Sequence, residues 1–384
     1  MQRKIKMGMI GGGRGSFIGK VHHIAAVLDN KIELVCGAFS SNPDVSKKSG
    51  KDYMLPDSRV YSNYREMIEK EGELPENDRM DFVSVVTPNN VHFAPAKLAL
   101  ERGFHVVCDK PMTFNLKEAI DLENIVNETG LLFCLTHTYT GYPMVKKARE
   151  ILRSGKLGKI RKIIVEYIQG WLSSEQEKSG NKQAAWRMDP EQAGISCTMG
   201  DVGVHAFNMV EYLTNLEVKI IAADLTSFIP GRKLDDDGSV LLKFDNGVKG
   251  VLTASQICAG EENNFSIKIY CEKGGIVWNQ MEPNTVLLKW QDKPMETIRT
   301  GWAERSKITG IHTRVPSGHP EGYIEAFANL YRNFAMHLSN VFFNGYYDGN
   351  YDYPTVHEGV RGMAFIEAVV ESSKNNSKWT NLSI

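Results

Sequence analysis

An aspartate and a histidine lie four residues apart near the middle of the chain, in the segment Gly200–His205. On an α-helix this spacing puts the side chains of Asp201 and His205 on one face. A histidine accepts the proton of an alcohol near neutral pH, and a carboxylate beside it stabilises its charged form. Two other interpretations stay open. One is a helix cap with a partly buried histidine; the other is a zinc site, although no third and fourth ligand occur at a recognisable spacing.

A lysine follows the apolar run His105–Cys108 in the turn Asp109-Lys110-Pro111. Because the proline restricts this turn, the ammonium group of Lys110 is positioned rather than free to move. The alternative is an ordinary surface lysine. We expect all three residues of the turn to line a ligand site, since ligands of doubly wound sheets bind beyond the carboxyl ends of the strands.

A second turn, Thr87-Pro88-Asn89, follows another apolar run, and His92 comes shortly after it. Like the turn with Lys110, it directly follows a predicted strand. We therefore expect Thr87, Pro88, Asn89 and His92 at the carboxyl edge of the sheet as well. The alternative is a plain Pro-Asn turn before the next helix.

A glycine-rich loop, Gly11–Gly19, connects the first predicted strand to the first predicted helix. Glycine lets the backbone approach a pyrophosphate, and the start of the helix offers amide groups and a positive dipole end. Gly11 and Gly13 fit the first two positions of G-x-G-x-x-G, and Ser16 fits the third. A glycine-rich turn without a ligand is the alternative. The residues expected to contact a dinucleotide here are Gly11, Gly13, Arg14, Gly15, Ser16, Phe17 and Ile18.

The second predicted strand ends without the Asp or Glu that would hold a ribose 2′-hydroxyl. Ser40 and Ser41 stand at this position and are expected to line the cofactor site. The missing carboxylate also removes repulsion against a 2′-phosphate, yet no arginine replaces it, and only Lys47 and Lys48 lie nearby. NAD and NADP therefore both stay open, with a slight preference for NAD.

The first third of the chain alternates short apolar strands with amphipathic helices. Strands are predicted at residues 5–10, 33–39, 80–87, 105–108 and 131–136, and helices at 18–28, 91–102 and 115–130. Strands this apolar, separated by helices, indicate a parallel sheet covered on both faces. The sequence therefore predicts a doubly wound α/β nucleotide-binding domain over residues 1–136.

The pattern changes near residue 137. Helices are predicted at 142–154, 201–213, 322–338 and 356–373, a strand at 160–169, a polar irregular stretch at 173–183, and a run of strands from 218 to 290 with turns at 245–247 and 273–275. This indicates a second α/β domain, residues 137–384, with a large, open, mostly antiparallel sheet. A large exposed sheet face is usually covered by another copy, so we expect a homodimer or homotetramer through this sheet.

The bulk composition excludes several classes of protein. The formal net charge of -1 over 384 residues argues against a nucleic-acid or membrane-surface protein. No apolar run reaches the roughly 20 residues that span a bilayer, and the start lacks the apolar core of a secretion signal. Six scattered cysteines do not suggest a disulfide framework, so a cytoplasmic location is expected.

Taken together, the glycine loop and the motifs around Asn89, Lys110 and His205 resemble, in order and spacing, those of the glucose–fructose oxidoreductase, inositol dehydrogenase and MocA (Gfo/Idh/MocA) family. The resemblance extends to Trp186-Arg187 and to Gly318–Tyr323, and so covers essentially the whole chain. It implies a Rossmann domain, a sheet-based second domain, and NAD- or NADP-dependent chemistry on sugars and inositols.

The resemblance also implies roles for individual residues. Lys110 would contact the nicotinamide ribose and the substrate hydroxyl, His205 would be the general base, and Asp201 its partner or a substrate ligand. This sequence departs from the family by having Asp109 where Glu is common. It also lacks the arginine that many members carry after the strand near residue 137. No metal is expected. The residues expected to contact the substrate, each of which could equally belong to the core, are His137, Tyr139, Trp171, Trp186, Arg187, His319 and Tyr323.

The predicted activity is hydride transfer between a nicotinamide cofactor and a hydroxyl-bearing carbon of a sugar or cyclic polyol. Two alternatives follow from the same resemblance: a glycosidase that acts by transient oxidation and elimination with bound NAD, and a non-catalytic nucleotide-sensing regulator. The presence of Lys110, Asp201 and His205 argues against the regulator.

Overall fold

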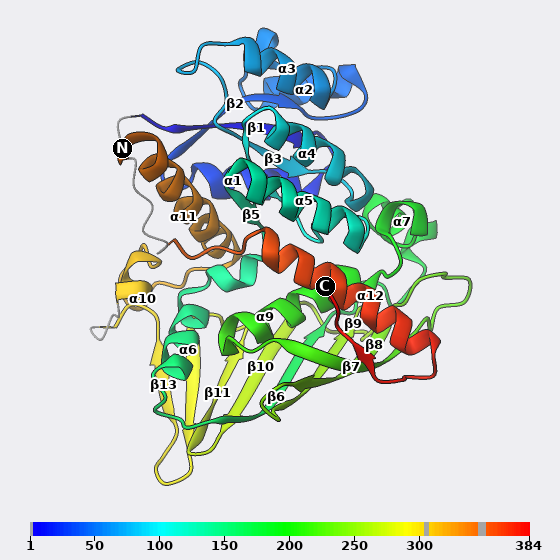
Figure 1. Cartoon of the computed structure of the whole chain (residues 1–384), viewed down its shortest axis with the longest axis vertical. Coiled ribbons are helices and arrows are strands. Elements are labelled where there is room, and N and C mark those ends of the chain that lie inside the picture. Colours follow the sequence, from blue (N-terminus) through cyan, green and yellow to red (C-terminus); the bar gives the residue numbers. More distant parts are fainter. Residues whose placement is uncertain (1–2, 303–306, 345–350) are drawn as a thin grey trace. The chain divides into compact units, whose positions relative to one another are not determined.

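The computed structural model describes residues 3–302, 307–344 and 351–384. The chain forms two compact units, shown along the sequence in Figure 1. Unit 1 comprises the chain up to Thr138 together with Phe327–Val360, and unit 2 comprises Tyr139–Ala326 together with Arg361–Ile384. The predicted domains were 1–136 and 137–384. In the structure the first boundary falls two residues later, and the late segment Phe327–Val360 belongs to unit 1.

Unit 1 is built on a five-stranded parallel sheet in the order β2-β1-β3-β4-β5. Its strands are β1 (Ile5–Gly11), β2 (Ile32–Ala38), β3 (Phe82–Val86), β4 (His105–Cys108) and β5 (Phe133–Leu135). Every residue of β3, β4 and β5 is buried, which explains why these strands are almost entirely apolar, with only Ser84 and His105 as polar members. The strand order reverses between β1 and β3, the place where such sheets bind ligands.

The helices of unit 1 begin at well-defined caps. Asn42, Asn63 and Asn115 each accept a backbone N–H in the first turn of α2, α3 and α5. Two of the helices, α2 and α3, fill the connection between β2 and β3, where no elements were predicted. The helices are α1 (Phe17–Val27), α2 (Pro43–Asp52), α3 (Tyr64–Glu73), α4 (Phe93–Glu101), α5 (Leu116–Thr129), most of α11 (Tyr323–Asn344), and the short turns η1 (Asp57–Arg59) and η2 (Asn89–Val91).

One face of the unit 1 sheet is shared by α1 and α11. His22 of α1 contacts Phe327 and Tyr331 of α11, and Phe334 of α11 packs on Phe82 of β3. These aromatic contacts explain why α11 belongs to unit 1 although it follows unit 2 in the chain. Helices α4 and α5 pack together elsewhere in the unit (Figure 1).

Unit 2 is built on a nine-stranded sheet in the order β13-β12-β11-β10-β6-β9-β8-β7-β14. Only the β6–β9 pair is parallel among these neighbours. The mostly antiparallel sheet confirms the predicted fold class. The strands are β6 (Ile160–Ile168), β7 (Val218–Thr226), β8 (Asp237–Phe244), β9 (Lys249–Ser255), β10 (Asn264–Cys271), β11 (Gly274–Asn279), β12 (Thr285–Trp290), β13 (Glu296–Arg299) and β14 (Thr380–Asn381).

The predicted turn at 273–275 is displaced in the structure. The chain turns at Glu272 and Lys273, and Gly274 and Gly275 already pair with β12. A Cβ on Gly274 would lie 2.3 Å from the backbone oxygen of Lys289. The first of these glycines therefore permits a close strand approach rather than a turn.

Helices α6 and α9 pack against strands of the unit 2 sheet (Figure 1). Phe207 of α9 stacks on Phe365 of α12. No helix among the described residues is long and apolar enough to cross a membrane. The helical segments are η3 (Thr138–Gly141), α6 (Pro143–Arg153), η4 (Gln176–Lys178), α7 (Lys182–Arg187), α8 (Pro190–Ala193), η5 (Met199–Gly203), α9 (Val204–Thr214), α10 (Lys307–Ile311) and α12 (Val356–Lys374), the last of which continues from unit 1 into unit 2.

An α-helix was predicted for the segment that carries Asp201, but the structure has a π-helix there. It spans Met199–Gly203, and α9 begins only at Val204. The α-helical rule that residues four apart share a face therefore does not apply to Asp201 and His205. Single turns of π-helix are frequent at functional sites.

Candidate active site

The motifs predicted to bind a cofactor lie at the carboxyl edge of the unit 1 sheet. Gly11 pairs with Val86, directly before Thr87, and Cys108, directly before Asp109, pairs with Leu135. The glycine loop, Ser40, Ser41, Thr87, Pro88, Asn89, His92, Asp109, Lys110, Pro111 and His137 all follow strand ends at this edge.

The glycine loop differs from the predicted G-x-G-x-x-G arrangement at its third position. Ser16 is the N-cap of α1 and accepts a hydrogen bond from the Gly19 amide at 3.2 Å. The close packing of helix on strand is made instead by Gly19, where an added Cβ would lie 2.3 Å from Gly12 Cα. Gly19 therefore has the role assigned to Ser16, because the loop before α1 is longer than the motif allows.

Thr87 has a buried hydroxyl that makes no hydrogen bond among the described residues. It lies beside Gly11, whose φ is +83° and where an added Cβ would meet the Thr87 methyl group at 2.9 Å. A buried polar atom without a partner is costly unless a ligand or water satisfies it. The orphaned hydroxyl, the glycine cradle and the Ser16-capped helix start together fit the pyrophosphate and ribose of a dinucleotide.

His92 connects two of the turns at this edge. Its ring nitrogens lie 2.8 Å from the Thr87 carbonyl oxygen and 2.9 Å from the Pro111 carbonyl oxygen, and the ring is buried. His92, which was predicted to touch the cofactor, therefore also joins the turn that carries Thr87 to the turn that carries Lys110.

Asp109 anchors the backbone of Lys110. Its Oδ1 accepts hydrogen bonds from the Lys110 amide at 2.9 Å and from the Thr136 hydroxyl at 2.8 Å. Burial alone would raise the pKa of the Asp109 carboxyl, but neighbouring His22, Lys110 and His92 hold it below its usual range. The ionised carboxylate of Asp109 is thus hydrogen-bonded to the backbone of Lys110, the lysine predicted to be catalytic.

The buried histidine behind Asp109 was not singled out from the sequence. His22 Nε2 lies 3.9 Å from Asp109 Oδ2, and His22 Nδ1 lies 2.7 Å from the Tyr331 hydroxyl. That hydroxyl also lies 2.7 Å from the hydroxyl of Ser84. The group links three separate elements of unit 1 to the turn that carries Lys110.

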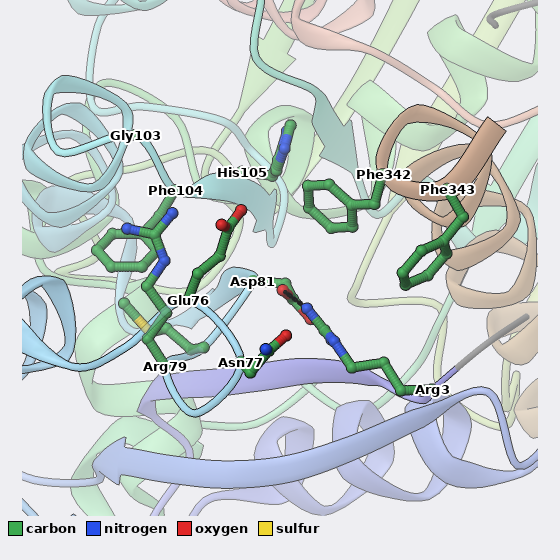
Figure 2. Close-up of a pocket in the computed structure, with 11 residues that line it drawn as sticks. Arg3, Glu76, Asn77, Arg79, Asp81, Gly103, Phe104, His105, Phe342 and Phe343 are labelled. Carbon is green, nitrogen blue, oxygen red and sulfur yellow. Dashed lines mark hydrogen bonds and ion pairs between the residues drawn. The ribbon is translucent and has the colours of Figure 1, made fainter. Parts of the chain in front are cut away.

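A pocket of about 230 Å³ lies elsewhere in unit 1 (Figure 2). It is lined by residues that precede or begin β1, β3 and β4, among them Arg3, Asp81 and His105, and by Phe342 and Phe343 of α11. Arg3 and Asp81 face one another there in a bidentate ion pair with distances of 2.6 and 2.7 Å. The pocket is therefore at the amino edge of the sheet and is not the predicted cofactor site.

In unit 2, the carboxylate of Asp201 is held by two donors. Its Oδ2 accepts from Arg187 Nε at 3.2 Å and from Gln256 Nε2 at 2.9 Å. Arg187 in turn lies over the ring of Trp186 at 4.3 Å and over that of Trp171 at 5.9 Å. Four of the predicted residues, Trp171, Trp186, Arg187 and Asp201, are thus brought together.

A chain of hydrogen bonds continues from Asp201 through the interior of unit 2. We call it the unit 2 network; its members, in order, are Arg187, Asp201, Gln256, Gln169, Asn263, Tyr167 and Tyr139, with Trp171 bonded to Gln169. The distances from Gln256 to Gln169, from Gln169 to Asn263 and from Tyr167 to Asn263 are 3.1, 2.7 and 2.8 Å. The network spans from the π-helix to the segment after β5.

The donors and acceptors of this network are determined by one indole. The Trp171 N–H can only donate, so the Gln169 oxygen that it contacts at 3.0 Å is an acceptor. Gln256 must then donate to Gln169 through Nε2, and the same amide nitrogen donates to Asp201. Asp201 consequently accepts a hydrogen bond from both Arg187 and Gln256.

His205 packs against the far end of the network. Its ring meets the Tyr139 ring edge-on, with centroids 4.9 Å apart. Tyr139 also lies 6.1 Å, ring to ring, from Tyr323. Burial raises the pKa of both Tyr139 and Tyr167, so both phenols stay protonated and hydrogen-bonded to one another.

Both parts of the chain match one family. Residues 5–137 match the oxidoreductase family with an NAD-binding Rossmann fold, and residues 145–277 match the GFO/IDH/MocA C-terminal domain. The chain belongs to the Gfo/Idh/MocA family of oxidoreductases. The resemblance seen in the sequence motifs is thereby confirmed.

Solved structures and a curated relative agree with this assignment. The inositol dehydrogenase homolog from Azotobacter vinelandii complexed with NAD⁺ has a TM-score of 0.95 at 32% identity, covering 99% of this chain and 98% of that one. An oxidoreductase from Sinorhizobium meliloti has a TM-score of 0.88 at 41% identity, covering 98% and 99%. The uncharacterized oxidoreductase YfiI of Bacillus subtilis (strain 168) is 30% identical over 383 residues, covering 99% of this chain and 97% of the relative.

Other residues of this Gfo/Idh/MocA oxidoreductase that position the site were missed in the sequence. Buried Asp235 accepts hydrogen bonds at 3.0 Å from Ser196, Cys197 and Met199, which fixes the start of the π-helix. Gln256, Gln169 and Asn263 lie at or beyond strand ends without a motif around them. No sequence signal separates them from other polar residues, because their partners come from distant parts of the chain.

The remaining predicted substrate residues lie in different surroundings. His319 is exposed, with Nδ1 3.3 Å from the Pro316 carbonyl oxygen. His137 is fully buried, and burial together with Lys110 lowers its pKa to about 3, so its ring is neutral. Among residues 3–302, 307–344 and 351–384, no three His, Cys, Asp or Glu side chains are grouped so as to hold a metal ion.

Proposed function

We propose that this family member is an NAD-dependent dehydrogenase that oxidises a hydroxyl-bearing carbon of a sugar or cyclic polyol. The observation that carries the proposal is the carboxyl edge of unit 1. There the glycine cradle, the Thr87 hydroxyl and Lys110 lie at the ends of the adjacent strands β1, β3 and β4. The Thr87 hydroxyl makes no hydrogen bond among the described residues. The bound nicotinamide would supply the hydride acceptor.

In this proposal, each catalytic residue has a distinct task. The Lys110 ammonium group binds the substrate hydroxyl and the cofactor ribose and favours loss of the hydroxyl proton by its charge. An imidazole nitrogen of His205 accepts that proton. Asp201, held by Arg187 and Gln256, presents a fixed negative charge that binds the substrate or stabilises the imidazolium.

The substrate class is supported by relatives and by the composition of unit 2. The Azotobacter vinelandii homolog has also been solved with NADH and myo-inositol, at a TM-score of 0.93 and 31% identity. In this chain, Trp171 and Trp186 flank Arg187, a mixture of aromatic faces and polar tips suited to a polyhydroxylated ring. Which sugar or polyol is used is decided by assay.

The test is a screen of inositols, hexoses and anhydrosugars with NAD and NADP separately, read by absorbance of the reduced cofactor. We expect one class to be oxidised, and Lys110→Ala and His205→Ala to lower kcat by roughly 1000-fold without changing the melting curve. Lys117→Ala, an exposed lysine on α5, is the control and keeps full activity. Near-normal rates in the Lys110 and His205 variants would contradict the assigned roles. Release of sugar from an aryl glycoside without added NAD would favour the elimination pathway instead.

We propose that a second copy covers the open face of the unit 2 sheet. Cross-strand partners form an apolar row there, interrupted by Lys268 alone: Leu287, Val277, Lys268, Ile164, Val251 and Leu241. A row of lysines flanks it on one side (Lys162, Lys249, Lys243), and a row with Glu166 and Asp224 on the other. A two-fold axis along the apolar row brings each lysine row opposite an acidic row.

Light scattering on the purified chain tests this assembly. We expect a dimer or tetramer, and Leu241→Glu, at a leucine that is 48% exposed, to dissociate it. Met54→Glu, at an exposed methionine in unit 1, is the control and leaves the assembly intact. A monomer at micromolar concentration would exclude the proposal.

A further inference from the structure

An exposed ion pair joins the glycine loop to the end of α2. Arg14 Nε lies 2.5 Å from Asp52 Oδ2, and Arg14 Nη2 lies 2.6 Å from Asp52 Oδ1. Both side chains are about half exposed, at 53% and 48%. The hydrogen bonds from Arg14 lower the pKa of Asp52, so the pair is fully charged at neutral pH.

The backbone around this pair is tied to the end of β2. The Gly13 amide donates to the Phe39 carbonyl oxygen at 3.1 Å, and the Arg14 amide donates to Ser49 Oγ at 3.0 Å. The Tyr53 hydroxyl donates to the Gly12 carbonyl oxygen at 3.1 Å. The bidentate pair is therefore held beside the carboxyl end of the second strand.

This is the place where a doubly wound sheet distinguishes the two nicotinamide cofactors. A carboxylate at the end of the second strand binds the ribose 2′-hydroxyl of NAD, whereas an arginine nearby accommodates the 2′-phosphate of NADP. Here β2 ends at Ala38 and is followed by Phe39, Ser40 and Ser41, without an acid. An arginine is nevertheless present at this place: Arg14, which comes from the glycine loop rather than from the segment after β2.

We propose that Asp52 selects NAD over NADP by engaging Arg14. The acid occupies both the Nε and one Nη of the guanidinium that would otherwise bind a 2′-phosphate, and its charge repels that phosphate. The inference rests on the proposed binding of a nicotinamide dinucleotide by the glycine loop. Exposed ion pairs add little to stability. We therefore expect this pair to affect which cofactor binds, through the charge of the cofactor, rather than the stability of the fold.

Apart from Asp52, the lysines and acids of α1 and α2 are four lysines and one acid, Asp44. Lys47, Lys48 and Lys51 lie exposed on α2, and Lys20 lies exposed on α1. Removing the charge of Asp52 leaves Arg14 among these cations, an environment that attracts a doubly charged phosphate. The predicted change is therefore a gain of NADP affinity, not merely a loss of NAD affinity.

Asp52→Asn tests the proposal directly. Equilibrium binding of NADH and NADPH is measured by cofactor fluorescence at low ionic strength, where exposed charges are least screened. We expect the unaltered chain to bind NADH more tightly than NADPH. In Asp52→Asn, NADPH binding should tighten about tenfold while NADH binding changes less than threefold. Asp44→Asn, an exposed acid in the first turn of α2, is the matched control and should leave both unchanged.

A double variant, Arg14→Ala with Asp52→Asn, separates the two side chains. We expect it to lose the gain in NADPH binding, because the released guanidinium is gone. An unchanged NADPH-to-NADH ratio in Asp52→Asn, or tighter NADPH than NADH binding by the unaltered chain, overturns the inference and leaves the dehydrogenase proposal standing. Failure of both cofactors to bind the unaltered chain overturns the proposed function and the inference with it.

Discussion

The glycine-loop edge of unit 1 and the network of unit 2 handle their polar groups in opposite ways. At the edge, Arg14 and Asp52 are exposed and the buried Thr87 hydroxyl has no partner among the described residues. In the network, the amides of Gln169 and Gln256 have their polar atoms bonded to neighbouring side chains. Both regions carry residues proposed to act on the same reaction, yet only one is internally complete.

The difference indicates which of the two regions is stabilised by ligand binding. A group left unpaired in the protein gains a partner only when a ligand arrives, so the edge of unit 1 gains stability from cofactor binding. The hydrogen bonds of the unit 2 network are already formed before a ligand binds, so its side chains need not be ordered during the reaction. Asp201 is thereby held in a fixed position, as catalysis requires. The comparison predicts that substitutions at the edge change affinity, whereas substitutions in the network change stability and turnover together.

Among the substitutions that test this comparison, the largest effect is expected from Gly19→Ala. The new Cβ would lie 2.3 Å from Gly12 Cα, so the loop must move away from the helix start. NADH affinity, measured by fluorescence, should fall at least about 100-fold, since the phosphate cradle depends on this contact. Gly72→Ala in α3, where an added Cβ meets nothing within 4 Å, is the control. Affinity within threefold of the unaltered chain would show that the edge does not depend on this packing.

Next in size is Gln256→Glu, which keeps the shape of the side chain but replaces a donor by an acceptor. The new carboxylate would face Asp201 Oδ2 and Gln169 Oε1, both of them acceptors. We expect kcat to fall by roughly 10- to 100-fold and the free energy of unfolding by about 1–3 kcal/mol. The exposed Gln291→Glu is the matched control. Full turnover in Gln256→Glu would remove the network from the mechanism.

Acid sensitivity separates the two regions further. Burial keeps His137 neutral, with a pKa of about 3 in the folded chain against an ordinary 6.5. The unfolded chain therefore binds the proton first as pH falls below 6.5, and stability is lost between about pH 6.5 and pH 3. At pH 5 the loss from this one group is about 2 kcal/mol.

Urea unfolding at pH 7 and pH 5 measures this loss. His137→Gln should reduce the difference between the two pH values by that amount, and exposed His319→Gln should not. The amides of the unit 2 network do not titrate in this range. If the free energy of unfolding of the His137 variant depends on pH as strongly as that of the unaltered chain, protonation of other groups causes the loss of stability.

The smallest effect is expected from Thr87→Val, which removes the orphaned hydroxyl and keeps the volume. Without ligand the variant should be more stable by about 1 kcal/mol, because a buried group without a partner is gone. NADH should bind a few-fold more weakly. Thr297→Val, at an exposed position of β13, is the control. A variant that is both less stable and unchanged in affinity would contradict the comparison.

The fold was predictable wherever a single element carries its own pattern. The apolar runs that became β3, β4 and β5, and the asparagine and glycine that bound α5, indicated their elements correctly. The α2–α3 connection was not predicted, since it lacks an apolar face long enough to show a period. The π-helix at Asp201 was also missed, because it depends on Asp235 and Gln256, whose bonds to this segment cross some 40 to 60 residues.

The sequence by itself determined the strand-loop-helix order of unit 1 and singled out Lys110, Asp201 and His205 as candidate catalytic residues, because motifs and periodicity are local properties. Only the tertiary structure decided which side chains those residues meet. It gave the close-packing role to Gly19 rather than Ser16, paired Arg14 with Asp52, and joined Asp201 to Gln256. The physical reason is that hydrogen bonds and ion pairs depend on distance in space, and strand order places neighbours together that the sequence keeps far apart.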